Sequence, residues 1–307
     1  MIDQIATRHL SKNFGRVHAV NDISLHVREG EIYGFLGLNG AGKTTTIRML
    51  LGMIRPTSGK SYLFSRKVNP ACHDIWKDVG YLVEIPFSYP DLTVWENLEI
   101  TRRMRFVDDP SSVDEIIEKL QLGSYRDRLA KNLSLGNAQR LGLAKALLHN
   151  PKILILDEPA NGLDPAGIVD IRELLKDLAV KQGVTIFISS HILGEISRFA
   201  NRIGIIHEGR LVQEVDTEQL DNLLRRRLLL RTRNNQTVKA TLKKEGYSVM
   251  LLDEDIIEVK DEKALLNPEN IATLLVHAEN PPFMLKVDEE DLETYFLRVI
   301  GAKGGVA

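Results

Sequence analysis

A glycine-rich stretch near the N-terminus has the residue types and spacing of a phosphate-binding loop. Gly37 and Gly42 bracket four residues and are followed by Lys43 and Thr44, which is the P-loop pattern. Glycines let successive backbone amides converge on a phosphate, and the helix that follows adds the positive end of its dipole. We expect Lys43 to reach the β- and γ-phosphates and the Thr44 hydroxyl to ligate Mg²⁺. The residues expected to contact the nucleotide here are Gly37, Asn39, Gly40, Ala41, Gly42, Lys43, Thr44 and Thr45.

A pair of carboxylates follows a hydrophobic run farther along the chain. Asp157 and Glu158 come directly after residues 153–156, at the strand end where the metal-binding aspartate of a P-loop site belongs. Because side chains alternate along a strand, the two carboxylates cannot share one role. We therefore expect Asp157 to hold Mg²⁺ through water and Glu158 to act as general base on an attacking water. The alternative is an acidic strand end that caps the next helix.

Short hydrophobic runs are placed so that they carry these residues. Residues 32–36 lead into the glycine-rich turn, and residues 44–53 have the pattern of a helix. Strand, turn and helix together predict a phosphate-binding unit and disfavour the alternative of a glycine turn that binds no ligand. Residues 153–156 and 184–188 are short, β-branched and almost free of polar side chains, which is typical of parallel strands buried on both faces. A helical pattern at 168–180 lies between them.

The remainder of residues 1–216 predicts an antiparallel sheet and a helical layer. Residues that suit strands alternate at Ile5, Thr7, Ile23, Leu25 and Val27. A turn is expected over residues 12–16, between these two segments. Residues from about 91 to 148 have helical spacing and no β-rich segment, so we expect a helical insertion there. The fold class predicted for residues 1–216 is an α/β P-loop nucleotide-binding domain.

Residues 217–307 have a different pattern and predict a second domain. The expected elements are a strand at 228–232, a helix at 238–245, strands at 247–252 and 256–260 joined by an acidic turn, a helix at 268–277, a strand at 283–287 and a last helix from residue 289. This βαββαβ order with one added helix is typical of a ferredoxin-like α+β domain. We expect an accessory domain that folds separately and contributes no group to hydrolysis.

The composition is that of a globular protein. Lys and Arg number 40 and Asp and Glu 42, for a net charge of −2, so no nucleic-acid partner is expected. The single cysteine, Cys72, excludes an internal disulfide and any metal site that needs two thiolates. No segment approaches the roughly 20 apolar residues that cross a bilayer, and the first ten residues lack the apolar run of a signal peptide. We expect a cytoplasmic protein that reaches a membrane only through another chain.

Further motifs resemble, in order, those of ATP-binding cassette (ABC) ATPases. Residues 133–140, LSLGNAQR, resemble the signature motif of that family, and residues 161–165, NGLDP, resemble its D-loop. His191, after two serines, is similar to the switch histidine, and Phe14 lies where the family has its adenine-stacking aromatic. The resemblance covers residues 2 to about 220. It implies a catalytic role for His191 and nucleotide contacts from Phe14, Ser134, Gly136, Asn137 and Asp164.

Three departures from the family pattern narrow the resemblance. Glu84 replaces the usual Gln, Leu135 the second signature glycine and Asn137 the usual signature Gln. Glu84 with a Ser-Leu-Gly signature resembles exporters of the bacitracin-resistance and lantibiotic-immunity type, as does the ending at 291–296. Because a carboxylate is attracted by the metal, we count Glu84 among the catalytic and metal-binding residues and expect it near Mg²⁺ only in the ATP-bound state. The alternative is a tolerated isostere.

The resemblance implies a head-to-tail dimer, of two identical chains or of paired ABC subunits, that encloses two ATP molecules. Ser134 and Gly136 of one chain would cap the γ-phosphate bound to Lys43 of the other. ATP closes the dimer, hydrolysis reopens it, and membrane permease subunits receive the change. The expected protein is thus a Mg²⁺-dependent ATPase on the cytoplasmic face of the membrane that exports drug, antibiotic-peptide or lipid-like substrates. The alternatives are an ABC ATPase that acts on nucleic acid or ribosomes and a regulatory nucleotide-binding module.

Overall fold

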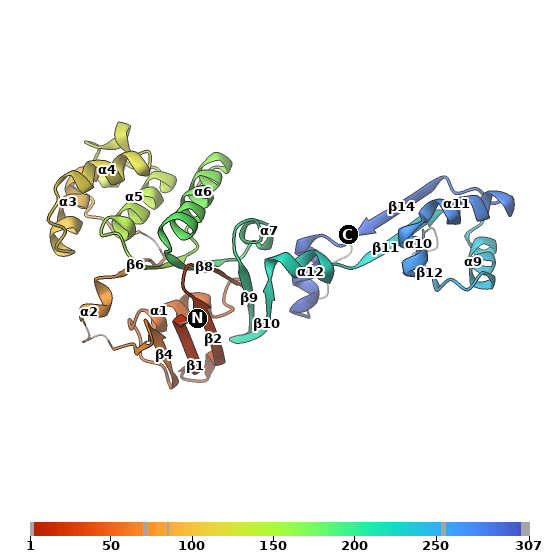
Figure 1. Cartoon of the computed structure of the whole chain (residues 1–307), viewed down its shortest axis with the longest axis horizontal. Helices are drawn as coiled ribbons and strands as arrows, with labels where there is room; N and C mark the ends of the chain where they lie inside the picture. The colour runs from red at the N-terminus through yellow and green to blue at the C-terminus, as the bar shows by residue number, and fades with distance from the viewer. Residues whose placement is uncertain (1–2, 70, 72, 85, 253–255, 302–307) are drawn as a thin grey trace. The chain divides into compact units, whose positions relative to one another are not determined.

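The structure is a computed structural model that describes residues 3–69, 71, 73–84, 86–252 and 256–301. The chain divides into two compact units, Met1–Gln219 and Leu220–Ala307. Figure 1 shows the elements of both units along the chain. Cys72 and the acidic turn expected between the strands at 247–252 and 256–260 lie outside the described residues.

The first unit is built on a six-stranded sheet with the order β10-β9-β3-β8-β7-β6. Its strands are β3 (Ile32–Leu36), β6 (Val79–Leu82), β7 (Ile153–Asp157), β8 (Thr185–Ser190), β9 (Arg202–His207) and β10 (Arg210–Asp216). All neighbours are parallel except β9 and β10. Every residue of β3, β7 and β8 is buried, which confirms the prediction of parallel strands covered on both faces.

A second, antiparallel sheet has the order β2-β1-β4-β5. Its strands are β1 (Asp3–Phe14), β2 (Val17–Arg28), β4 (Ser58–Leu63) and β5 (Arg66–Lys67). The expected turn over residues 12–16 is wrong in length, because β1 continues to Phe14, which pairs with Val17. Gly15 takes the left-handed conformation, with φ 58°, so two residues suffice to reverse the chain.

Helices cover the six-stranded sheet and form the insertion. They are α1 (Lys43–Leu50), α2 (His73–Trp76), α3 (Val94–Met104), α4 (Ser111–Lys119), η1 (Gly123–Tyr125), η2 (Ala130–Asn132), α5 (Leu135–Leu147), α6 (Pro165–Gln182) and α7 (Leu193–Ile196). Helix α1 was expected to run to residue 53 but ends at Leu50. The reason is Gly52, left-handed with φ 67°, after which the Met53 amide donates to the Arg48 carbonyl at 2.8 Å and closes a Schellman turn.

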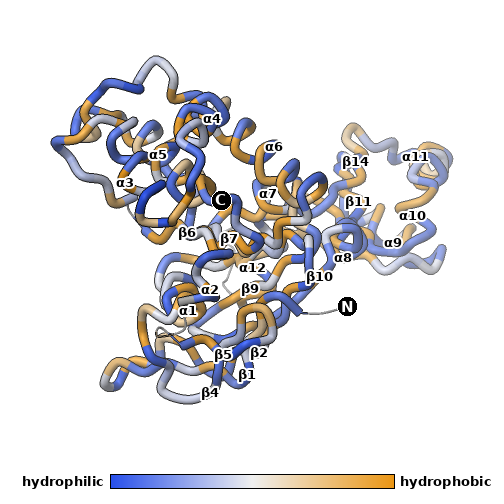
Figure 2. The backbone as a smooth tube through the Cα atoms, turned by 60° about the vertical axis from the view of Figure 1, so that its left-hand side comes forward, coloured by the Kyte–Doolittle hydropathy of each residue, from blue (hydrophilic) through white to orange (hydrophobic). Residues whose placement is uncertain are grey.

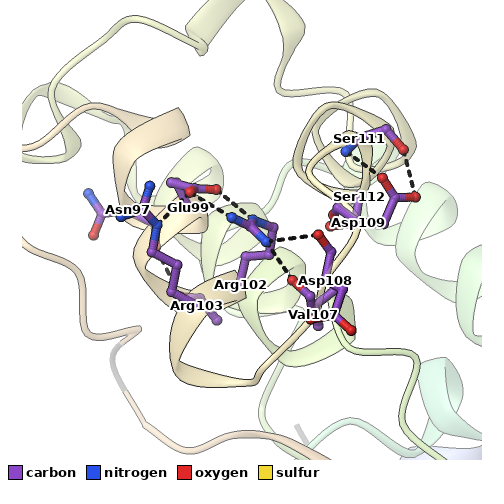
Figure 3. A network of polar contacts seen from close by, with 10 residues as sticks. Asn97, Glu99, Arg102, Arg103, Val107, Asp108, Asp109, Ser111 and Ser112 are labelled. Atoms are coloured by element: carbon purple, nitrogen blue, oxygen red, sulfur yellow. Dashed lines mark hydrogen bonds and ion pairs between the residues drawn. The ribbon is translucent and has the colours of Figure 1, made fainter.

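The insertion is held at its first helix junction by a polar network. The Arg102 guanidinium donates to both carboxylate oxygens of Glu99, at 2.7 and 2.9 Å, and to the Val107 carbonyl at 2.5 Å, between α3 and α4 (Figure 3). Arg103 donates to the same carboxylate at 2.7 Å. These hydrogen bonds lower the pKa of Glu99 to about 2, with Arg102 the largest cause. Helices α3 to α6 show both orange and blue along the tube in Figure 2, as amphipathic helices with one buried face do.

The second unit has one antiparallel sheet with the order β12-β13-β11-β14. Its elements are α8 (Leu220–Leu223), β11 (Arg226–Arg231), α9 (Asn235–Lys244), β12 (Val249–Leu252), β13 (Ile256–Val259), α10 (Glu262–Leu266), α11 (Pro268–His277), β14 (Met284–Glu289) and α12 (Leu292–Val299), preceded by η3 (Thr217–Gln219) at the end of the first unit. The last helix begins at Leu292 instead of residue 289, because the Asp291 side chain caps it, accepting from the Thr294 amide at 2.7 Å. Leu228, Leu230, Val238 and Ile257 belong to a core of its own.

Candidate functional site

The glycine-rich loop follows β3 and leads into α1, and its glycines are required by the backbone. Gly40 and Gly42 have φ 80° and 108°, a conformation that other residues rarely adopt. A Cβ on Gly37 would lie 2.6 Å from the Ile206 carbonyl oxygen. Helix α1 has no side-chain cap on its first turn, so its N-terminal amides are free to bind an anion. The loop therefore has the geometry of a phosphate cradle.

Lys43, the residue that follows Gly42, is buried, with 6% of its surface exposed. Its ammonium donates to the carbonyl oxygens of Gly37 at 2.6 Å and Leu38 at 3.3 Å. It also pairs with a carboxylate oxygen of Glu158 at 3.1 Å. The residues predicted around it differ in exposure: Asn39 and Gly40 are exposed, Ala41 is buried and Thr45 is half-buried. The lysine and the exposed loop residues are thus placed for a phosphate chain.

Thr44 and Asp157, the two residues expected to hold Mg²⁺, are in contact. The Thr44 hydroxyl donates to one Asp157 carboxylate oxygen at 2.7 Å, and the Ser189 hydroxyl donates to the other at 2.5 Å. Asp157 is 2% exposed. One hydroxyl and one carboxylate are hard oxygen ligands of the kind Mg²⁺ uses when phosphates and waters complete its shell. Within the described residues, no cluster of three His, Cys, Asp or Glu suits a metal held by the protein alone.

Glu158 lies between two other predicted residues. Besides its ion pair with Lys43, its second carboxylate oxygen lies 2.9 Å from Nδ1 of His191. Its backbone is left-handed, with φ 49°, and its amide donates to the Ser189 hydroxyl at 3.1 Å. The two carboxylates therefore have different partners, Lys43 and His191 for Glu158 and the Thr44 and Ser189 hydroxyls for Asp157.

The residues of the LSLGNAQR segment lie at the start of α5, against the NGLDP loop. Ser134 caps α5 by accepting from the Asn137 amide at 3.3 Å. A Cβ on Gly136 would lie 3.0 Å from the Gly162 carbonyl oxygen, so these two loops are in close contact. Asp164 caps α6, accepting from the Gly167 amide at 2.9 Å.

Phe14 and Glu84, also predicted from the sequence, have other partners. Phe14 ends β1 with half of its surface exposed, and the Lys12 ammonium lies 5.0 Å from its ring centroid. The carboxylate of Glu84 pairs with the Arg48 guanidinium of α1 at 2.6 Å. The structure thus pairs the Glu84 side chain with an arginine of the helix that follows the P-loop.

Comparison with known proteins decides the family. The ABC transporter family model matches residues 20–161. The bacitracin transport ATP-binding protein BcrA of Bacillus licheniformis is 39% identical over 97% of both chains, and the lantibiotic transport ATP-binding protein SrtF of Streptococcus pyogenes is 37% identical over 70% of this chain and 92% of its own. The chain belongs to the ABC transporter ATP-binding proteins. A dimeric bacterial ABC transporter cassette matches with TM-score 0.65 and 25% identity, over 69% of this chain and 98% of that chain.

The ABC fold places in one centre most of the catalytic residues predicted from the motifs. Strands β3, β8 and β7 are neighbours, and the P-loop, His191 and the Asp157–Glu158 pair follow their carboxyl ends. Ser189 and Gln139 also contribute to this centre, although neither was predicted from the sequence. The Gln139 side-chain amide donates to the Glu158 backbone carbonyl at 3.3 Å. Ser189 could have been found from its position directly after the strand predicted at 184–188, whereas the Gln139 contact depends on how α5 packs.

Two cavities lie in the first unit. One of about 620 Å³ lies beside Glu158 and His191, between α6 and α7. The other, of about 450 Å³, lies between β6, α3 and α5 and is lined by Arg48, Glu84, Phe87, Tyr89, Arg105 and Lys145, among others. Phe87 is 72% exposed, and the Lys145 ammonium lies 5.8 Å from its ring centroid. We call this second cavity the α3–α5 groove. No helix within the described part of the chain is long and apolar enough to span a bilayer.

Proposed function

We propose that this ABC ATPase hydrolyses ATP with Glu158 as general base and exports a peptide antibiotic through membrane permease subunits. The observation that carries the catalytic assignment is the position of Glu158, 3.1 Å from Lys43 and 2.9 Å from His191. A base must lie beside the phosphate-binding lysine and be held in orientation by a partner. Glu158 meets both conditions, whereas the Asp157 oxygens accept from the Thr44 and Ser189 hydroxyls.

The residues of the site then have separate tasks. Lys43 exchanges its carbonyl and Glu158 contacts for the phosphates, and this exchange frees the Glu158 carboxylate to accept a proton from water. His191 holds Glu158 through its second oxygen and keeps the carboxylate in place. Thr44 and Asp157 would hold Mg²⁺, which supplies positive charge to the phosphates when it is bound. Phe14, exposed at the end of β1, offers a face for the adenine.

The site requires a second chain. Ser134, Gly136 and Asn137 lie at the N-terminus of α5, where their contacts are with α5 and the loop at Gly162. An amide-rich helix start favours the γ-phosphate bound by another copy or a paired ABC subunit. ATP would thereby close the dimer, and hydrolysis would reopen it.

The α3–α5 groove is the proposed contact for the permease. It combines exposed aromatic side chains with the cations Arg105 and Lys145, whose pKa values burial lowers. A permease segment with apolar and acidic side chains fits such a lining. The named relatives transport bacitracin and a lantibiotic, so a peptide antibiotic is the proposed substrate. The ATPase then lies at the cytoplasmic face of the membrane through its permease, and no nucleic-acid partner is required.

The second unit is proposed to be an independent accessory domain of the ferredoxin-like type. The support is its antiparallel sheet, the βαββαβ order of its main elements and a core of its own. All the proposed site residues precede it. Its role would be regulation of the dimer or support for it.

The test of the catalytic proposal is the Glu158→Gln chain with its permease in vesicles. We expect ATP to bind and dimers to accumulate while both hydrolysis and antibiotic transport stop. Turnover close to that of the unchanged chain would assign the base to another residue. With the unchanged chain in the same vesicles, transport of an unrelated substrate but of no peptide antibiotic would refute the substrate assignment alone.

A further inference from the structure

The ion pair between Arg48 and Glu84 joins the P-loop helix to the α3–α5 groove. Its guanidinium nitrogen and carboxylate oxygen are 2.6 Å apart, with side chains 38% and 53% exposed. Both residues line the groove. A half-exposed pair of this kind is weak and is readily exchanged for a stronger partner.

Arg48 and the proposed metal ligand Thr44 lie on the same helix, α1. Thr44, the proposed metal ligand, lies four residues before Arg48 on the same helix, so both side chains project from one face, about 6 Å apart along the axis. The ion pair therefore ties Glu84 to the helix that carries the proposed metal ligand.

The backbone at Glu84 lies beyond the sheet and has an uncommon conformation. Glu84 has φ 56°, a left-handed conformation that is uncommon for a residue with a side chain. It follows β6 by two residues, outside the sheet ladder, so sheet hydrogen bonds do not fix it. Its carboxylate pairs with the Arg48 guanidinium at 2.6 Å.

We propose that Arg48 is a positioning residue that holds the Glu84 carboxylate at the groove while the site lacks Mg²⁺–ATP and releases it when the dication binds. This inference rests on the proposed placement of Mg²⁺ at Thr44 and Asp157. The exchange of partners by Glu84 links occupancy of the nucleotide site to the shape of the groove. Arg48 acts through Glu84 and is not itself a catalytic residue.

The experiment measures affinity for the imido analogue of ATP by calorimetry, with and without Mg²⁺, on the full chain. The readout is the ratio of the two affinities. We expect Arg48→Gln to raise this ratio by about threefold to tenfold, because Mg²⁺ no longer competes with the guanidinium for Glu84. Arg48→Lys keeps the charge and should retain the ratio of the unchanged chain.

Two further variants separate this role from a structural one. In a Glu84→Gln background, Arg48→Gln should leave the ratio unaltered, because the carboxylate is already absent. Arg103→Gln breaks the pair between an exposed arginine and Glu99, and should also leave the ratio unaltered. An unchanged ratio in Arg48→Gln, or an equal rise with and without Glu84, would overturn the inference. Absence of any Mg²⁺ effect on the unchanged chain would instead overturn the metal placement on which it rests.

Discussion

The Glu158 carboxylate contacts Lys43 and His191 at once, and these contacts determine the effect of its replacement. Its carboxylate competes with phosphate for Lys43, so Glu158→Gln should bind ATP more tightly. The same change removes the base and should lower turnover by at least about 100-fold. Calorimetry and a phosphate-release assay measure the two effects. Glu173→Gln, which neutralises an exposed glutamate of α6, is the matched control and should alter neither.

Ser189 supports both carboxylate residues from one hydroxyl, which donates to Asp157 and accepts from the Glu158 amide. Ser189→Ala should leave two buried groups with fewer partners, at about 1–3 kcal/mol of folding stability, and turnover should fall because Glu158 loses its anchor. Ser189→Thr retains the hydroxyl and should retain more activity. Urea denaturation and turnover test this. Equal activity in Ala and Thr variants would show that the hydroxyl does not position the base.

At the scale of elements, the polar network at Glu99 predicts a pH dependence. The pKa of Glu99 in the folded chain is about 2, below its ordinary value of 4.5. The stability that Arg102 and Arg103 provide through it is thus present above about pH 4.5 and is lost as pH falls toward 2. The difference in Tm between the unchanged chain and Glu99→Gln should be positive at pH 6 and shrink at pH 3. A constant difference would mean that packing of α3, and not this charge, matters.

The sequence predicted elements better than it predicted their ends. The hydrophobic pattern located β3, β7, β8 and α11, because buried positions are occupied by apolar residue types. The end of α1 depends on a Schellman turn at Gly52, and the end of β1 depends on a two-residue hairpin. Both are determined by the backbone conformation of single residues and not by a periodic pattern. The P-loop and carboxylates were predictable as contiguous motifs. The contacts of Arg48 with Glu84 and of Gln139 with Glu158 join distant segments, and no local pattern encodes them.

At the scale of the whole molecule, the two units predict that the chain can be divided. A chain ending at Gln219 should bind ATP with an affinity within about threefold of the full chain, because all the proposed nucleotide contacts precede that residue. Residues 220–307 should fold alone, because their sheet and helices enclose a core. Calorimetry on the first fragment and circular dichroism on the second check this. Loss of ATP binding in a folded 1–219 fragment would show that the second unit shapes the site.

The three adjacent strands β3, β8 and β7 hold the P-loop, His191 and Glu158 on one parallel ladder. Hydrogen bonds across that ladder leave little freedom for these groups to move apart, so nucleotide binding should change the association of two chains more than the structure of one. The affinity for ATP then depends on the protein concentration as well as on the site. By mass action, the apparent dissociation constant should fall as the protein is concentrated, and a dilute chain should hold ATP only weakly.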